Sequence, residues 1–254
     1  MSSSDLLLKA KIKNVGEWKA VLSAIKDITP EAMFIYNNEG ITFRGLDPAH
    51  VALMEVTFPK SSFEELETTA SFFGLNVEEF KSLLDTANNE DTIRLEITKP
   101  TVMEIIIEGS LQMNYVLRLI ERSEVNTPIP KIDVKSTLSI SPQTLTRIVT
   151  NLEKVSDHMT ITSVPDKVEF SGVGDISSAK IGLDKQNPEM SFLDVLEEST
   201  SMYSLEYMAR IIRSVGKASK NVSIKYGTKL PIHLLFEMPS FTKVEYYLAP
   251  RIEN

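Results

Sequence analysis

The side chains with the clearest potential for chemistry are lysines and arginines set at helical spacing. Arg210, Arg213 and Lys217 lie three or four residues apart, and Lys220 follows just beyond them. A helix would carry such residues on one side. Two more segments show the arrangement with fewer cations: Lys19 and Lys26 in one, Arg147 and Lys154 in the other. Spaced cations with few aromatic residues are suited to contacting the phosphates of a duplex without reading its bases.

The overall charge first argues against such contact, because the chain has 27 basic and 35 acidic residues and a formal net charge of -8. Phosphate binding relies on Lys and Arg. Segregation of charge changes this conclusion, since an acidic protein can still present one basic surface. The acidic residues are expected in loops and in a linker: Glu64, Glu65, Glu67, Glu90, Asp91, Glu121, Glu124, Asp194, Glu197 and Glu198. A fourth helical segment is weaker, with Lys81 among acidic neighbours, and a solvated polar face stays the alternative for each helix.

Residues that serve catalysis or metal binding occur without the partners they need. None of the three histidines, His50, His158 and His233, has a carboxylate or a second histidine at the spacing of a familiar metal motif. Cysteine is absent, and so are the glycine patterns of nucleotide-binding loops and of the nucleophile elbow. The glycine pair in Ser171–Asp175 is typical of a hairpin turn. The sequence therefore predicts a non-enzyme with no catalytic residues, no metal and no cofactor.

Signals for export or for a membrane are also missing from the sequence. No stretch approaches the ~20 apolar residues of a membrane span, and the N-terminal apolar run is too short for a signal peptide. The lack of cysteine fits a reducing compartment. We therefore expect a soluble, intracellular protein.

Four segments have the apolar periodicity of amphipathic helices, and they cover residues 15–28, 76–87, 141–155 and 204–215. Asn76 can cap the second helix, and Ser141 can cap the third with Pro142 in its first turn. Short runs rich in β-branched and aromatic residues follow each helix. Alternation within these runs, as in Lys167–Phe170, favours antiparallel sheets with one wet face. The expected fold class is therefore α+β.

The helices recur at a near-constant interval, because they begin near residues 15, 76, 142 and 204. This recurrence indicates an internal duplication into two similar domains, each with two helices packed on antiparallel sheet. A polar stretch between them contains Pro128 and Pro130, which disfavour helix and central strand. We expect an N-terminal domain at 1–117, an interdomain linker at 118–134 and a C-terminal domain at 135–254.

Several segments resemble one protein family. The stretch GLDPAHVALMEVTF (45–58) and the C-terminal VEYYLAPRIE (244–253) are similar to segments of the proliferating cell nuclear antigen family of DNA sliding clamps, as are ANNEDTIRLEI (87–97) and KLPIHLLFEM (229–238). The resemblance covers essentially the whole chain, and the lack of cysteine and of an acidic tail makes it most like the archaeal members. It implies the DNA-clamp fold and a closed ring around double-stranded DNA, formed by a homotrimer or by one subunit in a heterotrimer.

The resemblance also implies a function in DNA replication and repair, that of a polymerase processivity factor. The ring would hold enzymes on DNA by enclosure, and a separate ATP-driven loader would open it. The implied partners are DNA polymerase, flap endonuclease, DNA ligase and the clamp loader, which would dock short peptide motifs in a hydrophobic pocket. The implied location is the cytoplasm or nucleoid of an archaeon, or the nucleus of a eukaryote.

Three sets of candidate site residues follow. The DNA-binding set comprises Lys19, Lys26, Lys81, Arg147, Lys154, Arg210, Arg213, Lys217 and Lys220. The peptide-pocket set, carried over by the resemblance, comprises Leu46, His50, Val51, Leu53, Ile129, Pro130, Pro231, Tyr247, Ala249, Pro250 and Ile252. The subunit-interface set, placed by the resemblance, comprises Asn114, Tyr115, Leu117, Leu119, Ala179, Ile181 and Leu183.

Some assignments have alternatives or depart from the family pattern. Val51 and Leu53 are equally typical of core residues. Positions that are basic on the inner face of eukaryotic members hold Ala20, Ser82, Asp85 and Thr150 here, so the resemblance implies a less basic hole and weaker duplex contacts.

Two other functions stay open. A subunit of a heterotrimeric or checkpoint-type clamp would not form a ring by itself. A monomeric peptide-binding scaffold would never meet DNA. The mass in solution separates the first alternative from a homotrimer, and retention on closed DNA separates enclosure from the second.

Overall fold

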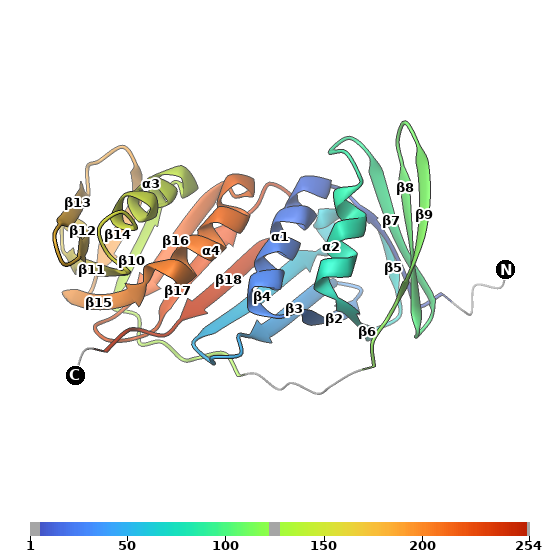
Figure 1. The fold of residues 1–254 in the computed structure, drawn as a ribbon, viewed down its shortest axis with the longest axis horizontal. Helices are drawn as coiled ribbons and strands as arrows, with labels where there is room; N and C mark the ends of the chain where they lie inside the picture. The colour runs from blue at the N-terminus through green and yellow to red at the C-terminus, as the bar shows by residue number, and fades with distance from the viewer. Residues whose placement is uncertain (1–5, 122–127, 253–254) are drawn as a thin grey trace. The chain divides into compact units, whose positions relative to one another are not determined.

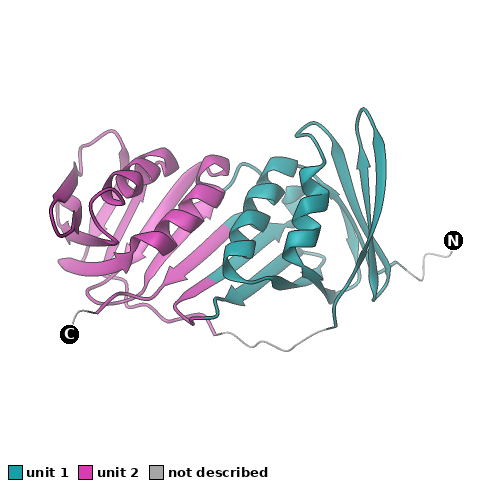
Figure 2. Ribbon diagram, viewed as in Figure 1, with its two compact units in different colours: residues 1–48, 54–127, 238–243 teal, residues 49–53, 128–237, 244–254 magenta. Residues whose placement is uncertain are grey.

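The computed structural model describes residues 6–121 and 128–252, which form two compact units (Figure 2). Unit 1 comprises residues 1–48, 54–127 and 238–243, and unit 2 comprises residues 49–53, 128–237 and 244–254. Each unit thus includes a short segment from the other half of the sequence. The continuous domain boundaries at 1–117, 118–134 and 135–254 stay a prediction, and linker residues 122–127 lie outside the described residues.

Unit 1 contains two helices and two sets of antiparallel strands (Figure 1). Its elements are β1 (Leu8–Ile12), α1 (Val15–Ile28), β2 (Glu31–Asn37), β3 (Gly40–Leu46), β4 (Ala52–Pro59), the 3₁₀ helix η1 (Lys60–Ser62), β5 (Phe63–Thr68), β6 (Ser71–Asn76), α2 (Val77–Asp85), β7 (Thr92–Lys99), β8 (Val102–Glu108) and β9 (Gln112–Arg118). The strands run in the orders β5-β1-β7-β8-β9 and β4-β3-β2-β6. Helices α1 and α2 lie side by side over these strands.

Unit 2 repeats this topology. Its elements are β10 (Ser136–Ile140), α3 (Pro142–Leu152), β11 (His158–Val164), β12 (Lys167–Val173), β13 (Ser178–Asp184), β14 (Met190–Val195), β15 (Ser199–Ser204), α4 (Leu205–Val215), the 3₁₀ helix η2 (Gly216–Ala218), β16 (Asn221–Tyr226), β17 (Ile232–Glu237) and β18 (Lys243–Leu248). The strand orders β14-β10-β16-β17-β18 and β13-β12-β11-β15 match those of unit 1 strand for strand. The predicted duplication and the α+β fold class are confirmed.

The helix starts follow local capping chemistry. Asn76 Oδ1 accepts a hydrogen bond from the Glu79 backbone N–H at 3.0 Å, and Ser141 Oγ accepts one from the Thr144 N–H at 3.0 Å. Both predicted caps are confirmed, since each satisfies an amide that the helix leaves unpaired. Asn14 caps α1 in the same way, although it was not expected.

The apolar stripes of the helices form the cores. Trp18 of α1 is 2% exposed and stacks on Phe58 with ring centroids 4.0 Å apart. Phe80 of α2 meets Trp18 edge-on at 6.5 Å, so one aromatic group joins both helices of unit 1 to the sheet. Burying each such side chain contributes about 1.5–3 kcal/mol. In unit 2, Leu205, Met208, Ile211 and Ile212 of α4 are buried in the same manner.

Two sequence-based expectations were wrong in detail. Glu64, Glu65 and Glu67 lie on strand β5 and Asp194 lies on β14, rather than in loops. On β5, Glu64 pairs with Lys11 at 2.5 Å and Glu65 with Lys9 at 2.6 Å. The acid-rich run concealed this strand, since carboxylates are rare in strands unless cross-strand cations offset them. The glycine pair is only partly in a turn, because Ser171 and Gly172 belong to β12 and the turn begins at Gly174.

Candidate nucleic-acid and peptide interfaces

The exposed faces of α3 and α4 in unit 2 carry cations. Arg147 projects from α3, and Arg210 and Arg213 project from α4, all three exposed to solvent. The apolar positions of each helix are buried, so these side chains emerge on the opposite side. Arg210 pairs with Glu206 one turn away, and its guanidinium lies 5.7 Å from the Tyr207 ring centroid. Arg213 pairs with Glu153 at 2.5 Å.

The remaining cations of unit 2 have few partners. Lys154, Lys217 and Lys220 are exposed. Lys154 Nζ donates to Asn151 Oδ1 at 3.4 Å, a neutral acceptor. Within the described residues, none of these lysines, nor Arg147, forms an ion pair with a carboxylate. Because exposed ion pairs are worth about 0–1 kcal/mol, even Arg210 and Arg213 can exchange their partners for phosphates.

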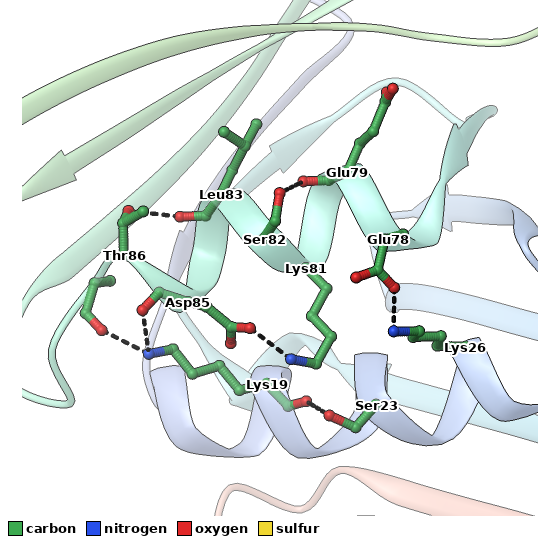
Figure 3. Close-up of polar contacts among 11 residues, drawn as sticks. Lys19, Ser23, Lys26, Glu78, Glu79, Lys81, Ser82, Leu83, Asp85 and Thr86 are labelled. Carbon is green, nitrogen blue, oxygen red and sulfur yellow. Dashed lines mark hydrogen bonds and ion pairs between the residues drawn. The ribbon is translucent and has the colours of Figure 1, made fainter.

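The corresponding cations of unit 1 are engaged (Figure 3). Lys26 pairs with Glu78 across the two helices, and Lys81 pairs with Asp85 at 2.5 Å. Hydrogen bonding to Glu78 raises the pKa of the Lys26 ammonium above its ordinary value. Lys19 Nζ donates to the backbone carbonyl of Ala87 at 2.5 Å, near the end of α2. A cation there satisfies carbonyls that the helix leaves unpaired and opposes the negative end of its dipole.

The two helix pairs therefore differ in charge. Helices α1 and α2 contain three basic residues and five acidic ones. Helices α3 and α4 contain three basic residues and one acidic one. Unit 2 thus presents the more positive helix surface, which a count of cations at helical spacing did not distinguish.

Most of the expected peptide-pocket residues belong to unit 2. The Ala249 backbone N–H donates to the Val51 carbonyl at 2.9 Å, which places the C-terminal segment beside residues 49–53. Ile129 is 39% exposed and Ile252 61% exposed, so both apolar side chains reach solvent, whereas Tyr247 is buried. Exposed apolar side chains that gather in one region are typical of interaction sites.

The other pocket residues vary in exposure. Leu53 is buried, as expected of the core alternative, and Val51 is half-buried. His50 is exposed and has a φ of 59°, in the left-handed region. Pro130, Pro231 and Pro250 are half-buried, and Ala249 is exposed. Leu46 is half-buried at the end of β3 in unit 1, and the C-terminal residues 253–254 lie outside the described residues.

Tyr247 has two partners that were not expected as site residues. Its ring stacks on His233 with centroids 4.4 Å apart, and its hydroxyl donates to Glu245 Oε2 at 3.1 Å. His233 Nε2 lies 2.9 Å from the same carboxylate oxygen. The signal for this group was the alternation of Glu245 and Tyr247 on β18, which puts both side chains on one face of the strand.

Strands β9 and β13 end their sheets, and both have the same burial pattern along seven residues. In the described chain each pairs with a single neighbour, β8 or β12. Leu117 and Leu183 are buried within the chain, whereas Tyr115, Leu119, Ala179 and Ile181 are half-buried and Asn114 is exposed. An edge of this kind can accept another strand through its backbone groups.

No helix in residues 6–121 or 128–252 is long and apolar enough to cross a membrane.

Comparison with known proteins covers both units. Residues 7–122 match the family model "Proliferating cell nuclear antigen, N-terminal domain", and residues 128–251 match that of the C-terminal domain. A DNA polymerase sliding clamp of Cenarchaeum symbiosum is 35% identical over 250 residues, covering 98% of this chain and 100% of that relative. Another from Nitrosopumilus maritimus is 33% identical over 246 residues, covering 96% of this chain and 98% of the relative.

Solved structures share the fold. The proliferating cell nuclear antigen of Thermococcus kodakaraensis superposes with a TM-score of 0.91 at 24% identity, covering 96% of this chain and 100% of the other. A PCNA2–PCNA3 complex from Sulfolobus tokodaii gives a TM-score of 0.88 at 23% identity, with the same coverage. At these identities the likeness concerns the fold alone.

Proposed function

The chain belongs to the proliferating cell nuclear antigen family, and we propose that it is a DNA polymerase sliding clamp that encircles duplex DNA and tethers replication and repair enzymes. The observation that carries this function is the match of both halves of the sequence to the two clamp domains, together with 35% identity to a sliding clamp over 98% of the chain. Sliding clamps act by enclosure, so the function requires no catalytic residue.

Ring closure rests on the two edge strands. We propose that β9 of one chain pairs with β13 of the next, with Tyr115 and Ile181 near the centre of the contact. The identical burial patterns of the two strands support this pairing, because the half-buried rows would join into one continuous apolar row. A head-to-tail interface that closes on itself leaves neither β9 nor β13 as an unpaired edge.

Unit 2 would provide most of the contacts with duplex DNA. Arg147, Lys154 and Lys217 have no carboxylate partner within the described residues, whereas the cations of α1 and α2 already have partners. Weak contacts of this kind suit a clamp that slides, since backbone phosphates repeat along the duplex and none is preferred. The cations of unit 1 thus stay members of the predicted DNA-binding set with a smaller contribution.

Tethering rests on the apolar surface around Tyr247 and the C-terminal segment. Short peptides of a polymerase, flap endonuclease, ligase or clamp loader would bury Ile129 and Ile252 there. A tethered enzyme stays at a high effective concentration beside its DNA substrate.

The proposal is tested by loading the clamp on closed circular DNA with a clamp loader and ATP. Retention that persists on the circle and disappears when the DNA is linearised supports enclosure, and equal retention on both forms contradicts it. Light scattering adds the assembly state: a homotrimer of three 28.5 kDa chains has a mass of 85.5 kDa. A persistent 28.5 kDa species that closes only with sister chains identifies a heterotrimer subunit instead.

A further inference from the structure

The turn between β17 and β18 exposes a phenylalanine whose backbone conformation is energetically unfavourable. Phe241 has a φ of 68°, in the left-handed region, and its side chain is 65% exposed. A bulky residue rarely adopts this region, where glycine is favoured. An exposed phenylalanine also gains nothing from burial in the free chain. The turn therefore carries two unfavourable features at one residue.

Buried hydrogen bonds hold this turn in place within unit 1. The Glu17 carboxylate of α1 is 3% exposed and accepts bonds from the Ser240 N–H, at 3.0 Å, and from the Ser240 hydroxyl. Ser62 Oγ donates to the Ser240 carbonyl at 2.9 Å and lies 3.2 Å from Thr242 Oγ1. Backbone strain persists where the surroundings determine the conformation, and it concentrates at ligand-binding positions.

Three lysines lie on the segments that are bonded to this turn or follow it. Lys243 follows the turn directly. The Lys13 backbone N–H donates to the Ser62 carbonyl at 3.4 Å, and Lys60 begins the 3₁₀ helix that contains Ser62. All three lysines are exposed, and within the described residues none forms an ion pair. The carboxylate that takes part in these contacts is that of Glu17, which is buried and bonded to Ser240.

We propose that Phe241, Lys13, Lys60 and Lys243 form a contact site for single-stranded DNA. An exposed aromatic ring among cations is the combination that binds single strands, because a base stacks on the ring while lysines contact the flanking phosphates. The helix faces provide cations without an exposed aromatic ring in the described residues, since Tyr207 of α4 is half-buried with Arg210 over it, and they are suited to the duplex. The site is therefore distinct in chemistry from the surface of α3 and α4. Its ligand is a phosphate polymer with unstacked bases, which a protein that works on DNA at replication sites encounters.

The test uses fluorescence anisotropy with a labelled oligothymidylate and, separately, a labelled blunt duplex. Phe241→Gly removes the ring and relieves the left-handed strain, so it does not endanger folding. We expect this variant to bind the oligothymidylate about tenfold more weakly and the duplex unchanged. Phe241→Trp should keep parental affinity, because it keeps a stacking surface. The matched control is Phe192→Ala, which removes another exposed phenylalanine on β14 and should change neither affinity.

The lysines are tested by salt dependence. Lys13→Gln and Lys60→Gln should each reduce the slope of log affinity against log salt by about 0.7 for the oligothymidylate. Equal affinities of Phe241→Gly and the parent would overturn the proposal. The proposal would also be overturned if polyglutamate displaced the oligonucleotide equally well from the parent and from Phe241→Gly. The surface would then bind anions in general. Retention of the variants on closed circular DNA stays parental in either case, so failure here is separate from failure of the clamp function.

Discussion

Helices α1 and α2 of unit 1 and helices α3 and α4 of unit 2 occupy the same positions in one duplicated topology, yet they differ in what their cations do. In unit 1, Lys26 of α1 pairs with Glu78 of α2, Lys19 of α1 bonds to the Ala87 carbonyl just past α2, and Lys81 pairs with Asp85 within α2. In unit 2, Arg147 and the lysines beyond each helix remain available. The difference teaches that a basic residue on a helix becomes a phosphate contact only where the structure supplies no nearer acceptor.

The physical reason lies in the number of carboxylates that each pair of helices carries. Helix α2 has Glu78 and Glu79 in its first turn and ends with Asp85, so Glu78 pairs with Lys26 of α1 and Asp85 with Lys81. Helix α3 has no acidic residue between Pro142 and Leu152. Attraction between exposed charges is weak and screened by salt. Local carboxylates nevertheless compete with DNA phosphates for the same cations.

The largest expected effect is on the free energy of unfolding, and it concerns the hydrogen bonds made by the first turns of α1 and α3. Glu17→Ala leaves the N–H and hydroxyl of buried Ser240 without their acceptor, and we expect it to lower the free energy of unfolding by about 3 kcal/mol. Thr144 occupies the equivalent place in α3, and its hydroxyl donates to the exposed Glu189. Thr144→Ala should cost about 1 kcal/mol. Urea denaturation measures both, and a larger loss for Thr144→Ala would contradict the stronger anchoring of unit 1.

The next effect tests the division of duplex contact directly. Arg210→Glu with Arg213→Glu should weaken duplex binding at least about tenfold and reduce its salt slope by about 2, since two phosphate contacts are lost. Lys19→Glu with Lys26→Glu should change duplex affinity far less. Anisotropy with a blunt duplex measures both pairs, and light scattering checks that assembly is unchanged. Equal losses for the two pairs would remove the distinction between the units.

A smaller effect is expected when the helices of unit 1 are made less acidic, like those of unit 2. Glu78→Gln with Asp85→Asn frees Lys26 and Lys81 from their carboxylates while keeping the size of the side chains. We expect duplex affinity to rise by about two- to fivefold, because two more cations become available and two repelling charges disappear. Glu79→Gln serves as the control, because it removes an exposed carboxylate of the same helix that forms no ion pair within the described residues. No gain in affinity would mean that the helices of unit 1 do not approach DNA.

The smallest expected effect is the change in stability at acid pH. Hydrogen bonding to Lys9 lowers the pKa of the Glu65 carboxyl on β5, and β14 of unit 2 has no such pair at the equivalent position. A lowered folded-state pKa contributes stability above the ordinary carboxyl pKa, and this contribution is lost as the pH falls through the folded value. Glu65→Gln should therefore shift the denaturation midpoint slightly at neutral pH and less at pH 3. A shift of equal size at both pH values would exclude an ionic origin.

Much of the fold could be predicted, because the deciding forces are local. The helix α1 begins and ends where its apolar period predicted, and Asn76 and Ser141 cap the helices that their positions indicated. Strand β5 could not be predicted, because Glu64 and Glu65 lie in a sheet only by virtue of Lys9 and Lys11, more than fifty residues away. The partners of Tyr247 were missed for a similar reason, since His233 lies on a neighbouring strand.

By itself, the sequence determined the helices, most of the strands, their duplication and the family, since periodicity, capping and motifs depend on residues close together along the chain. The tertiary structure decided which cations are neutralised, as with Lys19, whose acceptor at Ala87 is 68 residues distant. It also decided that residues 238–243 belong to unit 1 and that Phe241 is displayed in a strained turn. These outcomes depend on hydrogen bonds and charges brought together only by folding, and no spacing along the chain encodes them.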